Sequence, residues 1–185
     1  IPEDVVFGSS EEIMFKNNGV KGNLTIVIDD VKYNLTFKEG KASFKLPQNL
    51  SKGEHEVKFI YSGEDGQNYT KQSNIRVKDD SKMEVNVNNP TSGSDLIFTV
   101  KLPKFASGTV YVTINGKEYS GQIKMGVATI NVGKLSKDNY KAEIYYEGNS
   151  KYASSLKIID TSIIPSVPKI IANDLEVKGG SINLQ

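Results

Sequence analysis

The sequence contains no cysteine, no tryptophan and a single histidine, His55, among its 185 residues. The lack of cysteine excludes disulfide bonds, thiolate zinc sites and cysteine nucleophiles. One histidine does not make a catalytic triad, and no Gly-x-Ser-x-Gly motif accompanies it. The acidic pairs Asp29-Asp30, Glu64-Asp65 and Asp79-Asp80 each lie in an expected turn or linker, where a carboxylate stays solvated. We therefore predict a protein that is not an enzyme, with no catalytic residues and no cofactor.

An excess of charge of one sign and a long apolar run are also missing. Lys and Arg together number 23 and Asp and Glu 22, which leaves a net charge of +1. A nucleic-acid-binding protein would need a clustered basic face, so no nucleic-acid partner is expected. No apolar run approaches the roughly 20 residues that a membrane helix requires. We expect no membrane span in this sequence.

What the sequence does contain is an internal repeat. The stretch 22–69 aligns with the stretch 108–152, first at an offset of 86 residues and then, after Pro47, at an offset of 85. Two further residues are lost from the last loop, so that Tyr69 matches Tyr152. Self-similarity at a long fixed period is typical of tandem modules. The length differences fall in polar loops, which tolerate such changes.

Within each repeat, apolar and polar residues alternate with a period of two, which predicts strands with one buried face. In the second copy, Asn115-Gly116 interrupts this alternation and predicts a tight hairpin turn in which both residues have positive φ. Met125-Gly126 predicts a second turn. We expect three-stranded meanders at 109–115, 117–124 and 127–132, and at 23–29, 31–38 and 41–46.

The flanking segments add further strands at residues 4–7, 12–15, 55–62 and 70–77, and the second copy repeats them. About seven short strands with a turn every eight to twelve residues are typical of an immunoglobulin-like fold. The prediction is an all-β chain of tandem Greek-key β-sandwiches. Its domains are residues 1–79 and 80–165, with Asp79-Asp80-Ser81 as a semi-rigid joint between them.

Residues 166–185 resemble the opening of the second copy and are expected to form a linker and the first strands of a partial third repeat. A strand pair without its sheet is not stable alone. The tail therefore either is loose or packs on something, for example as an added strand on a sheet edge of a neighbouring molecule.

Two residues are candidates for a structural corner. Leu135 is followed by Tyr140 and Ala142, a spacing that resembles the tyrosine corner of β-sandwiches, in which the tyrosine hydroxyl bonds to upstream backbone. His55 occupies the equivalent position in the first copy. We interpret it as a corner residue with a local hydrogen bond, because a base or metal ligand needs partners that the sequence does not supply.

The motifs Gly-Thr-Val-x-Val-x-Ile-Asn-Gly-Lys and Leu-x-x-x-x-Tyr-x-Ala-x-Ile-x-Tyr-x-Gly-Asn-x-x-Tyr, at 108–117 and 135–152, resemble bacterial Ig-like repeats. They are most similar to those of adhesin-like surface proteins of methanogenic archaea. This resemblance implies an extracellular, cell-surface array that acts as a stalk or spacer and in cell attachment. The implied partners are neighbouring repeats, surface glycans or other cell-surface proteins. The resemblance carries over no binding residues.

Two other functions stay open. The chain is alternatively a subunit of an extracellular filament assembled by strand exchange through its tail, or a carbohydrate-binding accessory module of a secreted hydrolase. For the last, Tyr111 and Tyr145 are expected on an outward face, although the lack of tryptophan makes a poor platform.

Glycosylation is the modification with a local signal. The acceptor motif Asn-x-Ser/Thr occurs four times, all in the first repeat, at Asn23, Asn34, Asn49 and Asn68. Calcium at the joints would need oxygens from Asp79, Asp80 and Asn173-Asp174, but the Asp-x-Asp-x-Asp-Gly loop is missing, so no metal site is predicted. A Lys–Asn isopeptide bond is a further hypothesis, which a loss of roughly 17 Da in mass would reveal.

Overall fold

The computed structural model describes residues 3–17, 19 and 21–166, and the predicted partial third repeat lies outside them. In the described part of the chain, all regular structure is β. The first sandwich, as we call strands β1 to β7, consists of β1 (Asp4–Val6), β2 (Glu12–Lys16), β3 (Gly22–Ile28), β4 (Val31–Leu35), β5 (Lys41–Lys45), β6 (Gly53–Gly63) and β7 (Asn68–Lys78). The second sandwich consists of β8 (Glu84–Val87), β9 (Asp95–Lys101), β10 (Thr109–Ile114), β11 (Lys117–Gln122), β12 (Val127–Lys134), β13 (Asn139–Tyr146) and β14 (Ser155–Ser162).

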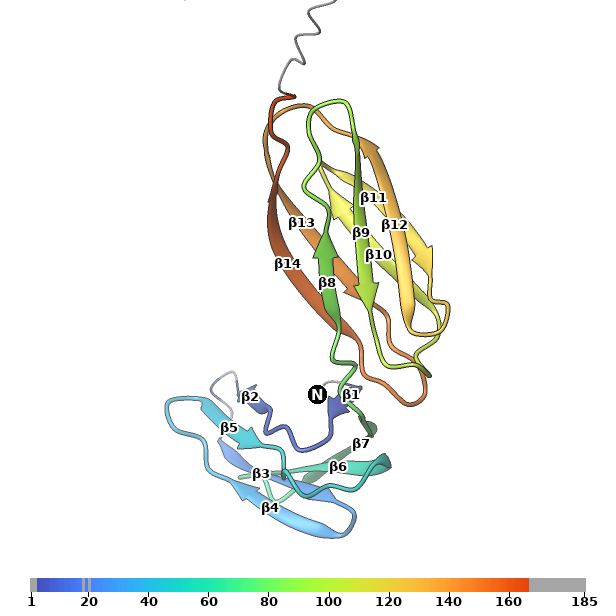
Figure 1. Cartoon of the computed structure of the whole chain (residues 1–185). Coiled ribbons are helices and arrows are strands. Elements are labelled where there is room, and N and C mark those ends of the chain that lie inside the picture. The colour runs from blue at the N-terminus through green and yellow to red at the C-terminus, as the bar shows by residue number, and fades with distance from the viewer. Residues whose placement is uncertain (1–2, 18, 20, 167–185) are drawn as a thin grey trace, which may run out of the picture.

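The predicted all-β sandwich fold is confirmed. The second sandwich packs a four-stranded sheet, β11-β10-β13-β14, on a three-stranded sheet, β12-β9-β8. The first has the same order over most of its length, β7-β6-β3-β4 opposite β2-β5. Figure 1 shows the strands of the second sandwich running up the page and those of the first running across it below.

The first strand is placed differently in the two sandwiches. β8 pairs antiparallel with β9, in the smaller sheet. β1 instead pairs in parallel with β7, with Asp4 opposite Arg76 and Val6 opposite Lys78, so it extends the larger sheet to five strands. The smaller sheet of the first sandwich consequently has two strands, β2 and β5.

The expected three-stranded meander is wrong in both copies. β3 and β4 form a hairpin, as do β10 and β11, but the third strand of each set crosses to the other sheet. β5 pairs with β2, and β12 pairs with β9. The physical reason is burial, because the apolar row of the third strand covers the opposite sheet and closes the core.

The tight turns form as the sequence predicts. Asn115 and Gly116 have φ values of 50° and 70°. At the equivalent position of the first sandwich, Asp29 and Asp30 have values of 46° and 69°. At the crossing between sheets, Gly126 has a φ of 78°, and a Cβ there would lie 2.6 Å from the Leu102 carbonyl oxygen. Both the backbone conformation and the close approach therefore require glycine at position 126.

Each sandwich has its own apolar core. The first core includes Ile26 and Val57, and the second includes Phe98 and Ile144, all of them fully buried. The two groups of buried residues share no member. The division into domains 1–79 and 80–165 stays a prediction.

Candidate functional site at the joint between the sandwiches

Asp79 connects the two sandwiches through its backbone. It follows β7 directly, and its N–H donates to the carbonyl of Lys151 at 2.9 Å. Its own carbonyl accepts from Ala153 N at 2.9 Å. These bonds make a parallel bridge between Asp79 and Tyr152, in the connection between β13 and β14. The last strand of the first sandwich thus continues into a ladder contact with the second.

Side chains add to the joint from the first sandwich. Lys52 Nζ lies 2.6 Å from Asp79 Oδ1 and 5.2 Å from the centre of the Phe7 ring. The Lys52 side chain is 53% exposed and that of Asp79 27%. Exposed ion pairs contribute only about 0–1 kcal/mol. The backbone bridge, rather than this ion pair, is therefore the main restraint on the joint.

The chain turns tightly as it enters the second sandwich. Lys82 has a φ of 43°, and its N–H donates to Asp80 Oδ1 at 2.9 Å. Ser81 and Met83 are 1% and 3% exposed. Within the described residues, Ser81 Oγ is buried without a hydrogen-bond partner. The predicted linker is thus ordered backbone packed into the second sandwich.

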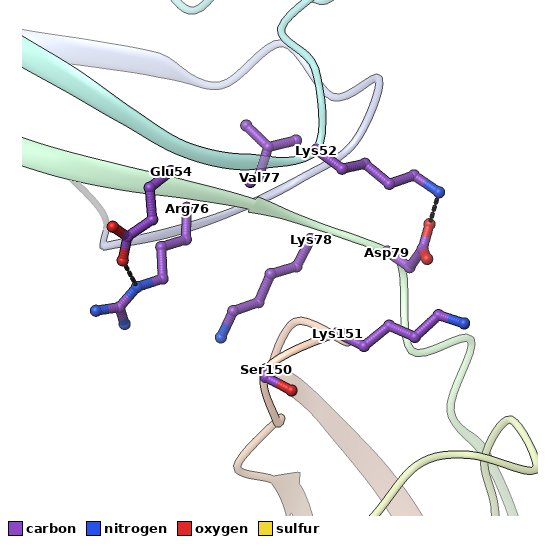
Figure 2. Close-up of a pocket in the computed structure, with 9 residues that line it drawn as sticks. Lys52, Glu54, Arg76, Val77, Lys78, Asp79, Ser150 and Lys151 are labelled. Carbon is purple, nitrogen blue, oxygen red and sulfur yellow. Dashed lines mark hydrogen bonds and ion pairs between the residues drawn. The ribbon is translucent and has the colours of Figure 1, made fainter.

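A cleft of about 790 Å³ lies at this joint. Figure 2 shows Lys52 joined to Asp79 at one end and Arg76 joined to Glu54 at the other. The residues that line the cleft are Lys52, Gly53, Glu54, Arg76, Val77, Lys78, Asp79, Ser150 and Lys151.

Most of the charges in the cleft have partners. Arg76 Nε donates to Glu54 Oε1 at 2.8 Å, and this bond raises the pKa of Arg76, which stays charged. The Lys78 side chain is only 10% exposed, and its Nζ contacts Asp4 Oδ2 at 2.8 Å. Lys151 Nζ lies 5.4 Å from the centre of the Tyr152 ring. These contacts hold the charged side chains of the cleft in place.

The two predicted corner residues both bond to upstream backbone. Tyr140 Oη donates to the carbonyl of Ser136 at 3.0 Å. His55 is 6% exposed, and its Nε2 donates to the carbonyl of Ser51 at 2.7 Å. Its Nδ1 donates to the Asp29 carboxylate. Burial opposes the charged imidazole, but the bonds to Asp29 and Ser51 outweigh it and raise the pKa of His55 above 6.5.

A buried tyrosine that donates to backbone was missed from sequence. Tyr146 is fully buried, and its hydroxyl donates to the carbonyl of Ser107 at 3.1 Å. Burial raises the pKa of Tyr146, so the hydroxyl remains a donor. The alternation places Tyr146 on the inward row, and an inward tyrosine needs a partner for its hydroxyl. This placement could have predicted the hydrogen bond from the sequence.

The four glycosylation candidates are all exposed. Asn23, Asn34 and Asn68 lie on β3, β4 and β7, and the sheet brings them onto one face. Asn49 lies apart from them, in the connection between β5 and β6.

The calcium and isopeptide hypotheses depend on which carboxylates, amides and lysines lie together. Among the described residues, no three His, Cys, Asp or Glu side chains gather as a metal site. The carboxylates of Asp79 and Asp80 bond to Lys52 and to a backbone N–H, and Asn173-Asp174 lie outside the described residues. The most deeply placed lysine of the joint, Lys78, faces a carboxylate and not an amide, and the isopeptide hypothesis stays a prediction.

No protein-family model matches the sequence, and no curated protein matches it. Solved structures do match. The fibronectin(III)-like modules of CbhA from Clostridium thermocellum align with a TM-score of 0.51 at 12% identity, over 93% of this chain and 94% of that one. A 1.5-MDa bacterial ice-binding adhesin gives a TM-score of 0.35 at 17% identity, over 89% and 62%. A chimeric titin Z1Z2 gives 0.34 at 13% identity, over 88% and 92%.

At these identities the likeness shows the fold alone, and the CbhA modules show it. In the described part of the chain, no helix is long and apolar enough to cross a membrane.

Proposed function

We propose that this chain is a non-enzymatic repeat region of an extracellular, adhesin-like cell-surface protein, and that it acts as a stalk or spacer. The observation that carries this proposal is the ordered joint. Asp79 belongs to the end of β7 and, through two backbone hydrogen bonds of 2.9 Å, to the second sandwich. A stalk must hold its units at a set distance, and a short ladder contact does so better than a flexible linker.

The test is a distance distribution across the joint. Because the chain has no cysteine, spin labels attach only where cysteines are introduced, for example at Lys45→Cys and Lys117→Cys, both exposed. We expect one narrow distribution in the native chain and a broad one after insertion of Gly-Gly-Ser-Gly between Lys78 and Asp79, which separates β7 from the backbone bridge. If the native chain is as broad as the insertion variant, the proposed spacer is wrong.

A carbohydrate-binding role is the second candidate, and one contact favours it. The rings of Tyr111 and Tyr145 stack at 6.4 Å on the outer face of the larger sheet of the second sandwich. Flat aromatic surfaces of this kind can bind sugar rings. Titration of the chain with neutral and acidic polysaccharides, followed by tyrosine fluorescence, distinguishes this role from a spacer. Loss of a response in Tyr111→Ala would support it, and no response in the native chain would exclude it.

The filament alternative depends on residues 166–185. Solution scattering on chains 1–185 and 1–165, over a concentration series, separates it from the spacer. Growth into dimers or chains in the longer one alone would favour strand exchange through the tail, and monomers in both would favour the stalk.

A further inference from the structure

Three of the four glycosylation motifs converge on one surface of the first sandwich. In the pairing of β3, β6 and β7, Asn23 lies opposite Ser62, and Ser62 lies opposite Asn68. In the next row of the same face, Thr25 lies opposite Asn34 on β4. We propose that this outer face, defined by Asn23, Asn34 and Asn68, carries N-linked saccharides that cover one side of the first sandwich.

The strand conformation arranges two of the motifs for this modification. Side chains two apart in a strand lie on the same side, so Asn23 and Thr25 face solvent together, as do Asn68 and Thr70. Neighbouring strands are roughly 4.8 Å apart. Asn23 and Asn68, two strands apart in the same row, are therefore separated by roughly 10 Å, and Asn34 and Asn68, three strands and one row apart, by roughly 16 Å. That spacing leaves room for a sugar on each and makes the saccharides cover a continuous area.

The hydrogen bonds of these amides leave the reacting atom accessible. Thr25 Oγ1 donates to Asn34 Oδ1 at 2.9 Å, and Ser62 Oγ donates to Asn68 Oδ1 at 2.7 Å. Both bonds use the amide oxygen. Glycosylation takes place at the nitrogen Nδ2. In this reaction Nδ2 forms a bond to the anomeric carbon of a lipid-linked saccharide phosphate and loses a proton. The bond from that carbon to the phosphate oxygen breaks, and the lipid phosphate leaves.

The equivalent face of the second sandwich has the opposite character. The row that holds Asn34 and Thr25 in the first sandwich is matched by Ser120, Tyr111, Tyr145 and Leu156 in the second. Tyr145 and Leu156 are 42% and 57% exposed. No acceptor motif occurs in residues 80–185, since Asn89 is followed by proline. The stalk therefore has a saccharide-covered unit followed by a bare, partly apolar unit. This deepens the proposed surface function, on which it rests, by assigning outside contacts to the second sandwich.

The test exploits the spacing of lysines in the first repeat. Trypsin releases the four motifs on separate peptides, at 22–32, 33–38, 46–52 and 59–71. The 185-residue chain is secreted from yeast, which supplies the lipid-linked donor, and is treated with peptide N-glycanase in ¹⁸O-water before mass spectrometry. We expect the peptides of Asn23, Asn34 and Asn68 to carry the label and the peptide of Asn89 to lack it. A folded, secreted chain with those three peptides unlabelled would overturn the proposal, and so would label on the Asn49 peptide alone.

Coverage of the face needs a separate readout. Lys58 lies on this face with a 40% exposed side chain, and Lys141, with 69%, lies on the outer face of the second sandwich. We expect acylation of Lys58 by an amine-reactive reagent to fall several-fold in the glycosylated chain and to recover in the triple variant N23Q/N34Q/N68Q. Acylation of Lys141 is the matched control and stays the same. Equal acylation of Lys58 with and without saccharides would refute the covering.

A gel-shift ladder from translation with microsomes gives the same count of saccharides without secretion. Fewer than three steps in that ladder would also contradict the proposal. Since the distance measurement across the joint uses unglycosylated protein, a failure of glycosylation leaves the spacer proposal standing.

Discussion

Two separate cores predict two separate unfolding transitions, and one buried isoleucine in each core provides a matched test. Ile26 and Ile144 are both fully buried, the first in the core of the first sandwich and the second in the other core. Truncation to alanine removes three carbons, worth roughly 2.4 kcal/mol of transfer free energy at about 0.8 kcal/mol each. The cavity left behind brings the loss to about 3–4 kcal/mol. In a unit of this size, that lowers the midpoint by roughly 12–30 °C.

The assay is differential scanning calorimetry of the native chain, of Ile26→Ala and of Ile144→Ala. We expect each variant to lower only one transition, a different one in each case. The control is Ile158→Ala on the outer face, where the side chain is 55% exposed and the change is within about 0.5 kcal/mol. If Ile144→Ala lowers the whole unfolding profile as one transition, the two sandwiches unfold as one unit and the reasoning from separate cores is wrong.

Three further predictions concern single positions. Asp79→Pro removes the backbone donor of the joint and broadens the spin-label distance distribution. Asp79→Ala removes only the ion pair to Lys52 and leaves the distribution narrow. Equal widths for the two variants would contradict this prediction. Because the pKa of His55 is raised by its bond to Asp29, its stabilising effect is full below pH 6.5 and is lost as the pH rises through the raised pKa. The thermal unfolding midpoint of the first sandwich therefore falls as the pH rises over that range, and His55→Gln removes this pH dependence. Gly126→Ala destabilises the second sandwich more than Gly116→Ala, because both glycines have positive φ but only at 126 would a Cβ meet backbone oxygen at 2.6 Å; equal midpoints in thermal melts would refute the close approach.

Local features of the fold could be predicted because they depend on neighbours in the sequence. The alternation of apolar residues identified every strand of the described chain to within a few residues. Asn115-Gly116 has positive φ at both positions because few residues other than Asn and Gly adopt that conformation at low cost. Strand ends were less well predicted, since β4 ends at Leu35 and not at residue 38.

Pairing between strands was predicted poorly, because the alternation says which face of a strand is buried but not which strand lies beside it. β5 has the same pattern whether it continues a meander or crosses to β2. The parallel placement of β1 beside β7 joins residues 4 and 76, and no local signal in Asp4–Val6 distinguishes it from the placement of β8. The joint has the same difficulty, because Asp79 meets Tyr152 only after both sandwiches have formed.

The two copies differ most where the core does not constrain them. Inward positions keep their character from copy to copy, as Ile28 and Ile114 do, because a close-packed core tolerates little change in volume. Outward positions do not: Thr25 is replaced by Tyr111, and Ile60 by Tyr145. A repeat that served only as a spacer would place no demand on its outer face, which would then drift toward ordinary polar residues. The second copy instead has two stacked tyrosines there, and the first has the acceptor asparagines, so we expect the proposed stalk to meet its surroundings at these outer faces.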